Sequence, residues 1–257
     1  MRKIHPTAII APTAKLGENV EIGPYSVIGE NVTINNNVKI HSHVVIEGWT
    51  TIGDNCEIFD STCIGNPPQD LHYNKEKSFI EIGKNNVIRE FVTIHSATGE
   101  GNKTIIGDNN FIMAYCHIAH NCIVGNNVTM VNGATLGGHV IVEDRVVISA
   151  YSPIHQFVRI GKIAMVGPLS KPDMDVPPYM LGVGNPFKVY TVNRVGLDRA
   201  GVSSSDKEII KKIYKLFYRS GLNVSQALES IKKELPQNEY VEHFIKFVEN
   251  SKRGICK

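Results

Sequence analysis

The sequence has few cysteines, and their spacing suits neither a disulfide framework nor a zinc ribbon. They are odd in number, and no two stand in a CxxC arrangement. A secreted protein stapled by disulfides is therefore not predicted, and a reducing compartment fits better. The five positions are Cys56, Cys63, Cys116, Cys122 and Cys256.

Long apolar runs are also missing. No window approaches 18 consecutive apolar residues, and the opening residues, MRKIHPTAII, contain no extended apolar stretch. A membrane span and a signal peptide both require such a run. We therefore expect a soluble, cytoplasmic protein with no membrane span.

Charge of one sign is not in excess, because 27 Lys and Arg face 25 Asp and Glu, a net charge of +2. The charges are uneven along the chain, however. Residues 188–257 carry 14 basic and 8 acidic side chains, a balance of +6, which leaves −4 for residues 1–187. The basic segment could bind an acidic partner or could simply solvate helix faces. Nucleic acid is not an expected partner.

What the sequence does contain is a six-residue repeat. An aliphatic residue recurs every six positions from Ile4 to Val166, and only positions 70, 76 and 100 depart from this phase. A small or β-branched residue precedes each aliphatic by two positions and shares its face of a strand. Gly and Asn often follow the aliphatic, and both accept left-handed backbone at tight corners. Each six-residue unit, or hexad, is thus predicted to be a short strand plus a corner.

Hexads of this kind are typical of a parallel β-helix, and these resemble the left-handed hexapeptide-repeat form. That resemblance implies three hexads per triangular coil, about nine coils over residues 4–166, and stacking of residues 18 apart at roughly 4.8 Å. The three departures from the phase fall in polar stretches, which predict two protruding loops, residues 65–81 and 96–104.

The C-terminal part has a different pattern. The stretch GPLSKPDMDVPPYMLGVGNP is rich in Pro and Gly and is predicted to be an irregular exit loop. Three helices are expected after it, beginning at Ser205, Ser225 and Asn238, with the first ending at Gly221. Ile209, Ile213, Leu216 and Phe217 have helical spacing and are expected to pack. We divide the chain into a β-helix domain, residues 1–187, and an α-helical domain, residues 188–257.

The stretch CHIAHNC, residues 116–122, is the clearest candidate site. The hexad phase sends both cysteines to the core and both His117 and His120 outward. Because one coil contains 18 residues, Gly138 is expected to stack on His120, and Gln156 on Gly138. The three residues are therefore predicted to form one column. His139 and His155 lie beside that column. Polar groups from three coils are thus predicted to converge on one edge.

Two kinds of chemistry suit such an edge. An exposed histidine titrates near neutrality and can remove a proton from an alcohol, while a glycine N–H can face a developing oxyanion. No outward Ser or Cys stands beside a base, so direct transfer is favoured over a covalent intermediate. Alternatively, three histidines could hold zinc with an open position, as in hexapeptide-repeat proteins of the carbonic-anhydrase type. A scaffold without catalytic activity is a third reading.

Several longer motifs carry a more specific resemblance. They are GNPPQDL, FVTIHSAT, HIAHN, LGGHV, HQF, DVPPYMLGVGNP and VNRVGLDRAG. Together with the hexads, these motifs resemble the cytoplasmic UDP-N-acetylglucosamine O-acyltransferase family that begins lipid A biosynthesis. The resemblance runs nearly end to end.

The resemblance implies transfer of an (R)-3-hydroxyacyl chain from acyl carrier protein to the 3-hydroxyl of UDP-N-acetylglucosamine. A related acceptor with a 3-amino group stays open as an alternative. It also implies a homotrimer with sites between adjacent prisms, no cofactor and no metal.

The family pattern implies that His120 is the general base and that the Gly138 N–H stabilises the oxyanion. The implied substrate-binding residues are Gln69, Asp70, His72, His95, His117, His139, Gln156, Asn193 and Arg199.

Three positions depart from the family pattern. Asn121 stands where the family usually has an aspartate that orients the imidazole. We expect Asn121 to orient His120 without balancing the charge of the protonated ring, so that His120 is a weaker or differently tuned base. His72 stands where the family commonly has lysine. Pro168 replaces a small residue beside the acyl tail, which predicts a shorter acyl chain.

Overall fold

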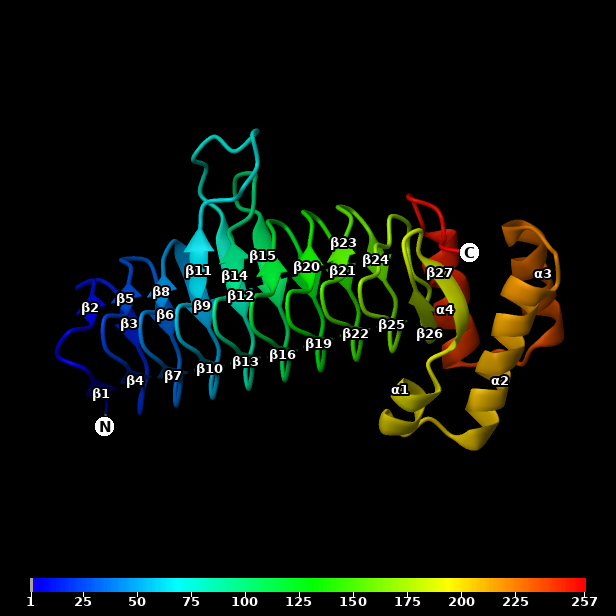
Figure 1. The fold of residues 1–257 in the computed structure, drawn as a ribbon, viewed down its shortest axis with the longest axis horizontal. Helices are drawn as coiled ribbons and strands as arrows, with labels where there is room; N and C mark the ends of the chain where they lie inside the picture. The colour runs from blue at the N-terminus through cyan, green and yellow to red at the C-terminus, as the bar shows by residue number, and fades with distance from the viewer. Residues whose placement is uncertain (1) are drawn as a thin grey trace.

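The chain winds into a triangular prism of short parallel strands and ends in a group of helices, as the computed structural model shows for residues 2–257 (Figure 1). The first sheet contains β1 (Lys3–Ile4), β4 (Glu21–Ile22), β7 (Lys39–Ile40), β10 (Glu57–Ile58), β13 (Val87–Ile88), β16 (Phe111–Ile112), β19 (Thr129–Met130), β22 (Val147–Ile148) and β25 (Met165–Val166). The second contains β2 (Ile9–Ile10), β5 (Val27–Ile28), β8 (Val45–Ile46), β11 (Cys63–Asn66), β14 (Thr93–His95), β17 (His117–Ile118), β20 (Thr135–Leu136) and β23 (Pro153–Ile154). The third contains β3 (Lys15–Leu16), β6 (Thr33–Ile34), β9 (Trp49–Ile52), β12 (Phe79–Ile82), β15 (Lys103–Ile106), β18 (Ile123–Val124), β21 (Ile141–Val142) and β24 (Arg159–Ile160).

Neighbouring coils stack in the predicted register. Ile4 pairs with Ile22, and Ile22 pairs with Ile40, each partner lying 18 positions further along the chain. The spacing changes only where a coil carries a protruding loop. Ile58 pairs with Ile88, because the first loop adds residues, and Ile88 pairs with Ile112, because the second loop adds fewer.

The prism core consists of the stacked aliphatic residues and the small residues two positions before them. Ile58, Ile88 and Ile118 are fully buried, as are Cys116 and Cys122. Burying one such isoleucine side chain contributes about 1.5–3 kcal/mol, so the repeated column supplies much of the stability of the prism. The inward positions predicted for the two cysteines are confirmed.

The left-handed backbone predicted at the corners of the coils is present at the asparagines but not at glycines such as Gly17 that directly follow an aliphatic residue. Asn37 and Asn55 have positive φ, and the Nδ2 of Asn37 donates to the Oδ1 of Asn55 over 3.2 Å, one rung of a ladder along the edge. Gly17 is not in this conformation. A Cβ at Gly17 would lie 2.6 Å from the backbone carbon of Asn35 in the next coil. The prediction of left-handed glycine corners was wrong, because these glycines serve close stacking of the coils instead.

The predicted exit loop contains regular structure that the sequence reading missed. β26 (Met180–Val183) adds to β25 in parallel, and β27 (Lys188–Val192) pairs with β26 in the antiparallel sense. The predicted division between residues 187 and 188 therefore falls between two paired strands. It stays a prediction.

In the described residues, 2–257, four α-helices follow β27. They are α1 (Arg194–Arg199), α2 (Ser204–Tyr214), which continues as the π-helical segment η1 (Lys215–Arg219), α3 (Val224–Glu234) and α4 (Glu239–Glu249). The caps of α2 and α3 are Ser203 and Asn223, each two residues before the predicted start, whereas Asn238 caps α4 as predicted. Short α1 was not foreseen.

The helices pack on the last coils of the prism and on one another. Ile213 and Phe217 are buried, and Ile209 and Leu216 pack against the core while partly exposed, so the expected packing is confirmed. Ile210 is fully buried as well. Several polar contacts attach the α4 region to the prism. His243 Nε2 lies 2.7 Å from Glu143 Oε2, and the hydroxyl of Ser251 donates to the buried Asp175 over 2.8 Å.

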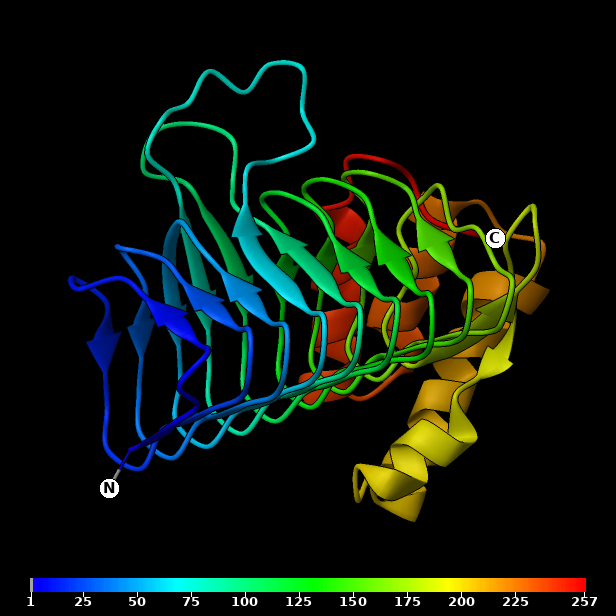
Figure 2. The same cartoon turned by 60° about the vertical axis from the view of Figure 1, so that its left-hand side comes forward.

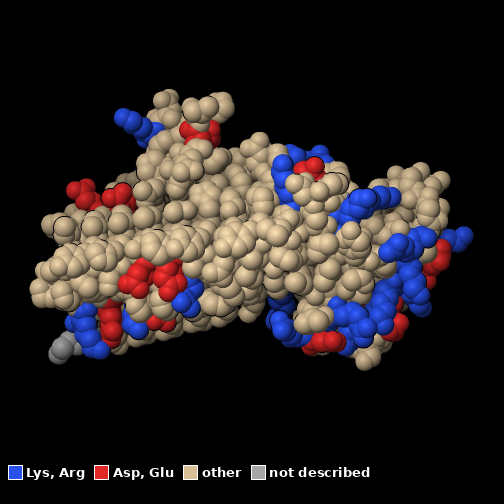
Figure 3. Space-filling view, in the orientation of Figure 1, with Lys and Arg blue, Asp and Glu red and all other residues tan. Residues whose placement is uncertain are grey.

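Lys and Arg side chains gather over the helical end of the molecule, while most of the prism face in the same view carries few charges (Figure 3). Among residues 2–257, no helix is long and apolar enough to cross a membrane.

Candidate active site

Two loops protrude together from one edge of the prism (Figures 1 and 2). The first joins β11 to β12 and the second joins β14 to β15, so both predicted loops are present. They are tied to each other. The N–H of Gly99 donates to Glu76 Oε1 over 2.6 Å, and the N–H of Gly101 donates to the carbonyl of Lys77 over 2.8 Å. The pair forms one wall beside the histidines.

His120 lies at the corner that follows β17, and its ring is only partly buried. Its Nδ1 lies 2.8 Å from the Oδ1 of Asn121. The His139 ring meets it edge-on, with ring centroids 5.2 Å apart, and is itself stacked on Phe157. The imidazole is therefore held on its Nδ1 side and along one edge.

Gly138 stands directly over His120, as the 18-residue spacing predicts. A Cβ at residue 138 would lie 2.5 Å from His120 Nε2, so a side chain there would displace the imidazole. The absence of that side chain leaves space at Nε2.

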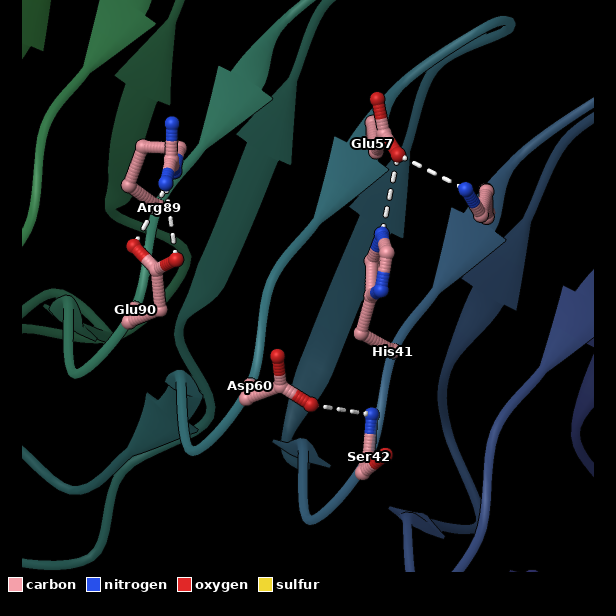
Figure 4. Close-up of polar contacts among 7 residues, drawn as sticks. His41, Ser42, Glu57, Asp60, Arg89 and Glu90 are labelled. Carbon is pink, nitrogen blue, oxygen red and sulfur yellow. Dashed lines mark hydrogen bonds and ion pairs between the residues drawn. The ribbon is translucent and has the colours of Figure 1, made fainter.

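In many hexads, the residue two positions after the buried aliphatic donates its backbone N–H to a side-chain oxygen of the next coil. Figure 4 shows one example, in which the N–H of Ser42 donates to Asp60 Oδ1 over 3.0 Å. Gly138 occupies the same hexad position, but the residue above it is Gln156 rather than Asp or Asn. Within residues 2–257, the Gly138 N–H has no hydrogen-bond acceptor. This donor is free to bind an anionic oxygen.

Three further histidines surround His120 and are held neutral. Burial, helped by His95 and His120, lowers the pKa of His117 to about 4. Burial and the same His120 also lower the pKa of His95 and of His139. The rings of His95 and His117 meet edge-on at 5.0 Å, and His117 Nδ1 lies 2.7 Å from the hydroxyl of Thr93. These histidines can donate or accept hydrogen bonds without carrying charge at neutral pH.

Asp70 brings the negative charge of the first loop close to this group. Its Oδ1 accepts the backbone N–H of His72 over 3.0 Å and lies 3.1 Å from His72 Nδ1. These contacts, first of all the backbone N–H, together with the nearby His120 lower the pKa of Asp70 to about 2. The carboxylate is thus charged throughout the physiological range.

Other predicted residues do not meet His120 within one chain. Gln69, Gln156, Pro168 and Arg199 are exposed, and His155 Nδ1 lies 3.1 Å from the carbonyl of Gln156. Asn193 is buried and has a clear structural role. It caps α1 by accepting from the N–H of Gly196 over 3.0 Å, and its Nδ2 donates to the carbonyl of Ile163 over 2.7 Å. The functional roles of these residues stay predictions.

The sequence reading missed two threonines that contact the site. Thr98 in the second loop bonds the Asn121 side chain through its backbone, and the hydroxyl of Thr104 accepts the Asn121 N–H over 2.9 Å. Thr98 lies in a loop outside the repeat, and Thr104 lies in β15 rather than in the column that contains His120. The six-residue period therefore could not indicate that either residue contacts the site.

The residues present do not fit a metal centre built from one chain. Among residues 2–257, no three His, Cys, Asp or Glu side chains are grouped as a metal ion requires.

A prism of six-residue repeats with a partly exposed histidine beneath a glycine is the architecture expected of the hexapeptide-repeat acyltransferases. Comparison with known families agrees with this class. The family model described as "Bacterial transferase hexapeptide (six repeats)" matches residues 103–138. A second family model, described as "Udp N-acetylglucosamine O-acyltransferase; Domain 2", matches residues 175–256.

Individual proteins give a more specific result. The chain is 50% identical to the acyl-[acyl-carrier-protein]–UDP-N-acetylglucosamine O-acyltransferase of Thermodesulfovibrio yellowstonii. The alignment covers the full length of both proteins. It is 50% identical to the protein of the same name from Gloeothece citriformis, over 96% of this chain and 90% of that one.

Two solved structures superpose closely. The UDP-N-acetylglucosamine acyltransferase of Bacteroides fragilis has a TM-score of 0.95 at 39% identity, covering 98% of this chain and 99% of its own. That of Campylobacter jejuni has a TM-score of 0.93 at 39% identity, covering 99% of each chain. The expected left-handed parallel β-helix followed by helices is confirmed. The chain belongs to the acyl-[acyl-carrier-protein]–UDP-N-acetylglucosamine O-acyltransferase family and is an acyltransferase.

Proposed function

We propose that the protein transfers an (R)-3-hydroxyacyl chain from acyl carrier protein to the 3-hydroxyl of UDP-N-acetylglucosamine, the first step of lipid A biosynthesis. The names of its full-length relatives support the substrates. The observation that carries the chemistry is the position of His120 Nε2 beneath Gly138, whose N–H has no acceptor within residues 2–257.

The reaction needs a base and an oxyanion donor on the same side of the thioester. His120 Nε2 removes the proton of the sugar hydroxyl as its oxygen attacks the thioester carbon. The carbonyl oxygen becomes an oxyanion and accepts the Gly138 N–H. When the tetrahedral intermediate collapses, the carbon–sulfur bond breaks and the carrier thiolate leaves. The protonated Nε2 then returns its proton to the sulfur.

The two histidines of the neighbouring strands are poor candidates for this base. Burial lowers the pKa of His117 and of His95, which weakens both rings as proton acceptors. Their hydrogen-bonding capacity suits substrate binding instead. We assign His95, His117 and His139 to that role.

The first loop is suited to bind the nucleotide sugar. Asp70 presents a carboxylate, and charged acceptors form the stronger hydrogen bonds with sugar hydroxyls. Gln69 is exposed beside it, and His72 holds the carboxylate from the other side. Gln156, at the end of the His120 column, completes the proposed set in the prism.

We further propose that the active enzyme is a homotrimer in which adjacent prisms complete each site. Arg199 and Pro168 are exposed and make no contact with His120 in their own chain, so a neighbouring subunit would have to present them. The side chain of Asn193 would act indirectly, because its amide caps the helix that carries Arg199.

The basic helical end suits an acidic carrier protein. Lys211 and Lys212 lie near the end of α2, and Lys215 and Arg219 follow in η1. The gathering of Lys and Arg over these helices is visible in Figure 3. Electrostatic steering of this kind weakens with salt, so the KM for the acyl carrier should rise with ionic strength while the KM for the sugar changes little.

The test is to incubate the purified protein with UDP-N-acetylglucosamine and a panel of 3-hydroxyacyl carrier proteins, and to identify products by mass spectrometry. A product with one added 3-hydroxyacyl group, lost after alkaline ester hydrolysis, is expected. The exposed Pro168 predicts that shorter acyl donors react faster. Absence of any acylated sugar would contradict the function, and a clear preference for long donors would contradict only the chain-length proposal.

A further inference from the structure

Trp49 is the one tryptophan of the sequence, and its ring lies on the outside of the prism. It begins β9 at an outward position, and 40% of its surface is exposed. A large apolar ring gains little from folding at such a position unless another group covers it. The Nζ of Lys77 lies 3.5 Å from the centroid of the Trp49 ring, within the range of a cation–π interaction. The ring therefore has a partner in the first loop.

The backbone around Trp49 is closely packed. A Cβ at the preceding residue, Gly48, would lie 2.8 Å from the carbonyl oxygen of Gly65 in the next coil. Thr50, the following residue, is buried. The Phe79 ring, paired with Trp49 across the third sheet, meets it with ring centroids 6.2 Å apart in an edge-on arrangement. Strand β9 thus holds the indole ring in place.

Residue 77 joins the first loop to two other parts of the molecule. Its side chain contacts Trp49 in the third sheet, and its backbone contacts the second loop. The Lys77 N–H donates to Glu100 Oε2 over 3.0 Å, and the Lys77 carbonyl accepts the N–H of Gly101 over 2.8 Å. Because both loops meet at this residue, the cation–π contact attaches the pair to the face of the prism.

The first loop is not packed solidly against the prism behind it. A cavity of about 320 Å³ lies there, and its lining includes Trp49, Tyr73, Lys77 and Ser96. A loop with a cavity beneath it can shift when its attachment is lost. The contact between Lys77 and Trp49 borders this cavity and opposes such a shift.

Hydrogen bonds within the loop connect Lys77 with Asp70, the proposed sugar ligand. The carbonyl of Asp70 accepts the N–H of Tyr73 over 3.1 Å, which closes a turn. The N–H of Asn74 donates to Glu76 Oε2 over 2.7 Å, and Glu76 directly precedes Lys77. The segment from residue 70 to residue 77 is therefore held together by its own hydrogen bonds, and a displacement of its end would move Asp70.

We propose that Lys77 is a positioning residue, which binds the Trp49 ring and so holds the first loop where Asp70 meets the nucleotide sugar. The inference rests on the binding role of Asp70 in the proposed function. Lys77 touches no substrate, and its effect passes through the loop. Loss of the contact should therefore weaken sugar binding and leave the chemical step at His120 unchanged.

Three substitutions and one control test the contact. Lys77→Met removes the charge and keeps the length of the side chain, while Trp49→Leu removes the ring. Lys77→Arg is the conservative variant, because a guanidinium also binds an aromatic face. Lys75→Met is the matched control, since it removes an equal charge from an exposed position of the same loop. Circular dichroism and thermal melting establish that each variant is folded.

The first measurement is amide hydrogen exchange of residues 67–78 in the ligand-free protein, read by mass spectrometry. Exchange should be about two- to five-fold faster in Lys77→Met and in Trp49→Leu, the range that loss of one exposed cation–π contact gives. The double variant should exchange no faster than either single variant, because both substitutions remove the same contact. Lys77→Arg and Lys75→Met should exchange like the wild type.

The second measurement is the Kd for UDP-N-acetylglucosamine, obtained by isothermal titration calorimetry. Lys77→Met should weaken binding about two- to five-fold while kcat stays unchanged, and Lys77→Arg should bind like the wild type. In an Asp70→Asn background, Lys77→Met should have no further effect, because its effect passes through the Asp70 carboxylate.

Wild-type exchange in Lys77→Met would overturn the attachment, and faster exchange with unchanged affinity would overturn the positioning role. An equal loss of affinity in Lys75→Met would assign the effect to charge alone and would also overturn the proposal. The exchange measurement needs no substrate. Absence of any acylated sugar, which would contradict the proposed function, is therefore distinguishable from failure of this inference.

Discussion

Gly138 lies so close over His120 that a methyl group on its Cα would come within 2.5 Å of Nε2. Gly138→Ala should therefore displace the imidazole and lower kcat by about 100-fold or more, because catalytic geometry and the oxyanion N–H are both disturbed. Steady-state kinetics with saturating substrates check this prediction. Gly29→Ala is the control, since its nearest atoms would lie at 3.3 Å and it is remote in sequence from the site. Wild-type kcat in Gly138→Ala would contradict the assignment.

His117 should make the stability of the protein depend on pH. Burial lowers its pKa to about 4, whereas an unfolded histidine has a pKa of about 6.5. Below about pH 6.5 the unfolded chain binds a proton that the folded chain excludes, so stability falls as the pH drops from about 6.5 to about 4. The contribution should be roughly 2 kcal/mol, reduced from the full shift because the ring is partly accessible.

Urea unfolding at pH 7 and pH 4.5 measures this contribution when wild type and His117→Asn are compared. The variant should lose less stability between the two pH values than the wild type does. Equal losses would show that His117 is not held neutral by the fold.

Asp70 should act in binding rather than in folding. Its carboxylate stays ionised because its pKa is held at about 2, and it lies in the protruding first loop. Asp70→Asn should raise the KM for the nucleotide sugar about ten-fold, the usual value of a charge-assisted hydrogen bond, while the melting temperature stays unchanged. Asp60→Asn is a suitable control, because an amide oxygen can still accept the Ser42 N–H. A change in kcat alone would argue against this role.

The cysteines of the CHIAHNC stretch should be chemically inert. Burial raises the pKa of the Cys116 thiol to about 11 and that of the Cys122 thiol to about 12. Neither forms thiolate at pH 8, so native alkylation should reach the half-buried Cys63 before either of them. Peptide mass spectrometry after brief treatment with iodoacetamide reads the order. Rapid labelling of Cys122 would contradict the assigned core position.

The repeat phase explains why much of this site could be read from the sequence. A fixed period separates inward from outward positions, so Cys122 could be assigned to the core and His120 to the surface. The same arithmetic placed Gly138 over His120, and the structure confirms that stacking. It works only where no loop interrupts the coils, and Ile58 pairs with Ile88 rather than with residue 76 for that reason.

The remaining features depend on contacts that no period encodes. Thr98 reaches Asn121 from a loop outside the repeat, and its contribution comes from the backbone, which every residue type possesses. Gly17 was misread because a glycine needed for close stacking cannot be distinguished from one needed for a left-handed turn. β26 was missed because its pairing with β25 continues the prism through a segment rich in Pro and Gly.

The assignment of His120 as the general base is tested most directly by the transfer rate of His120→Ala with 3-hydroxyacyl carrier protein and UDP-N-acetylglucosamine. Positioned general bases contribute about 10²–10⁴-fold, so kcat should fall by at least about 10²-fold in a variant that binds both substrates and melts like the wild type. A His120→Ala enzyme with the wild-type kcat would contradict the account.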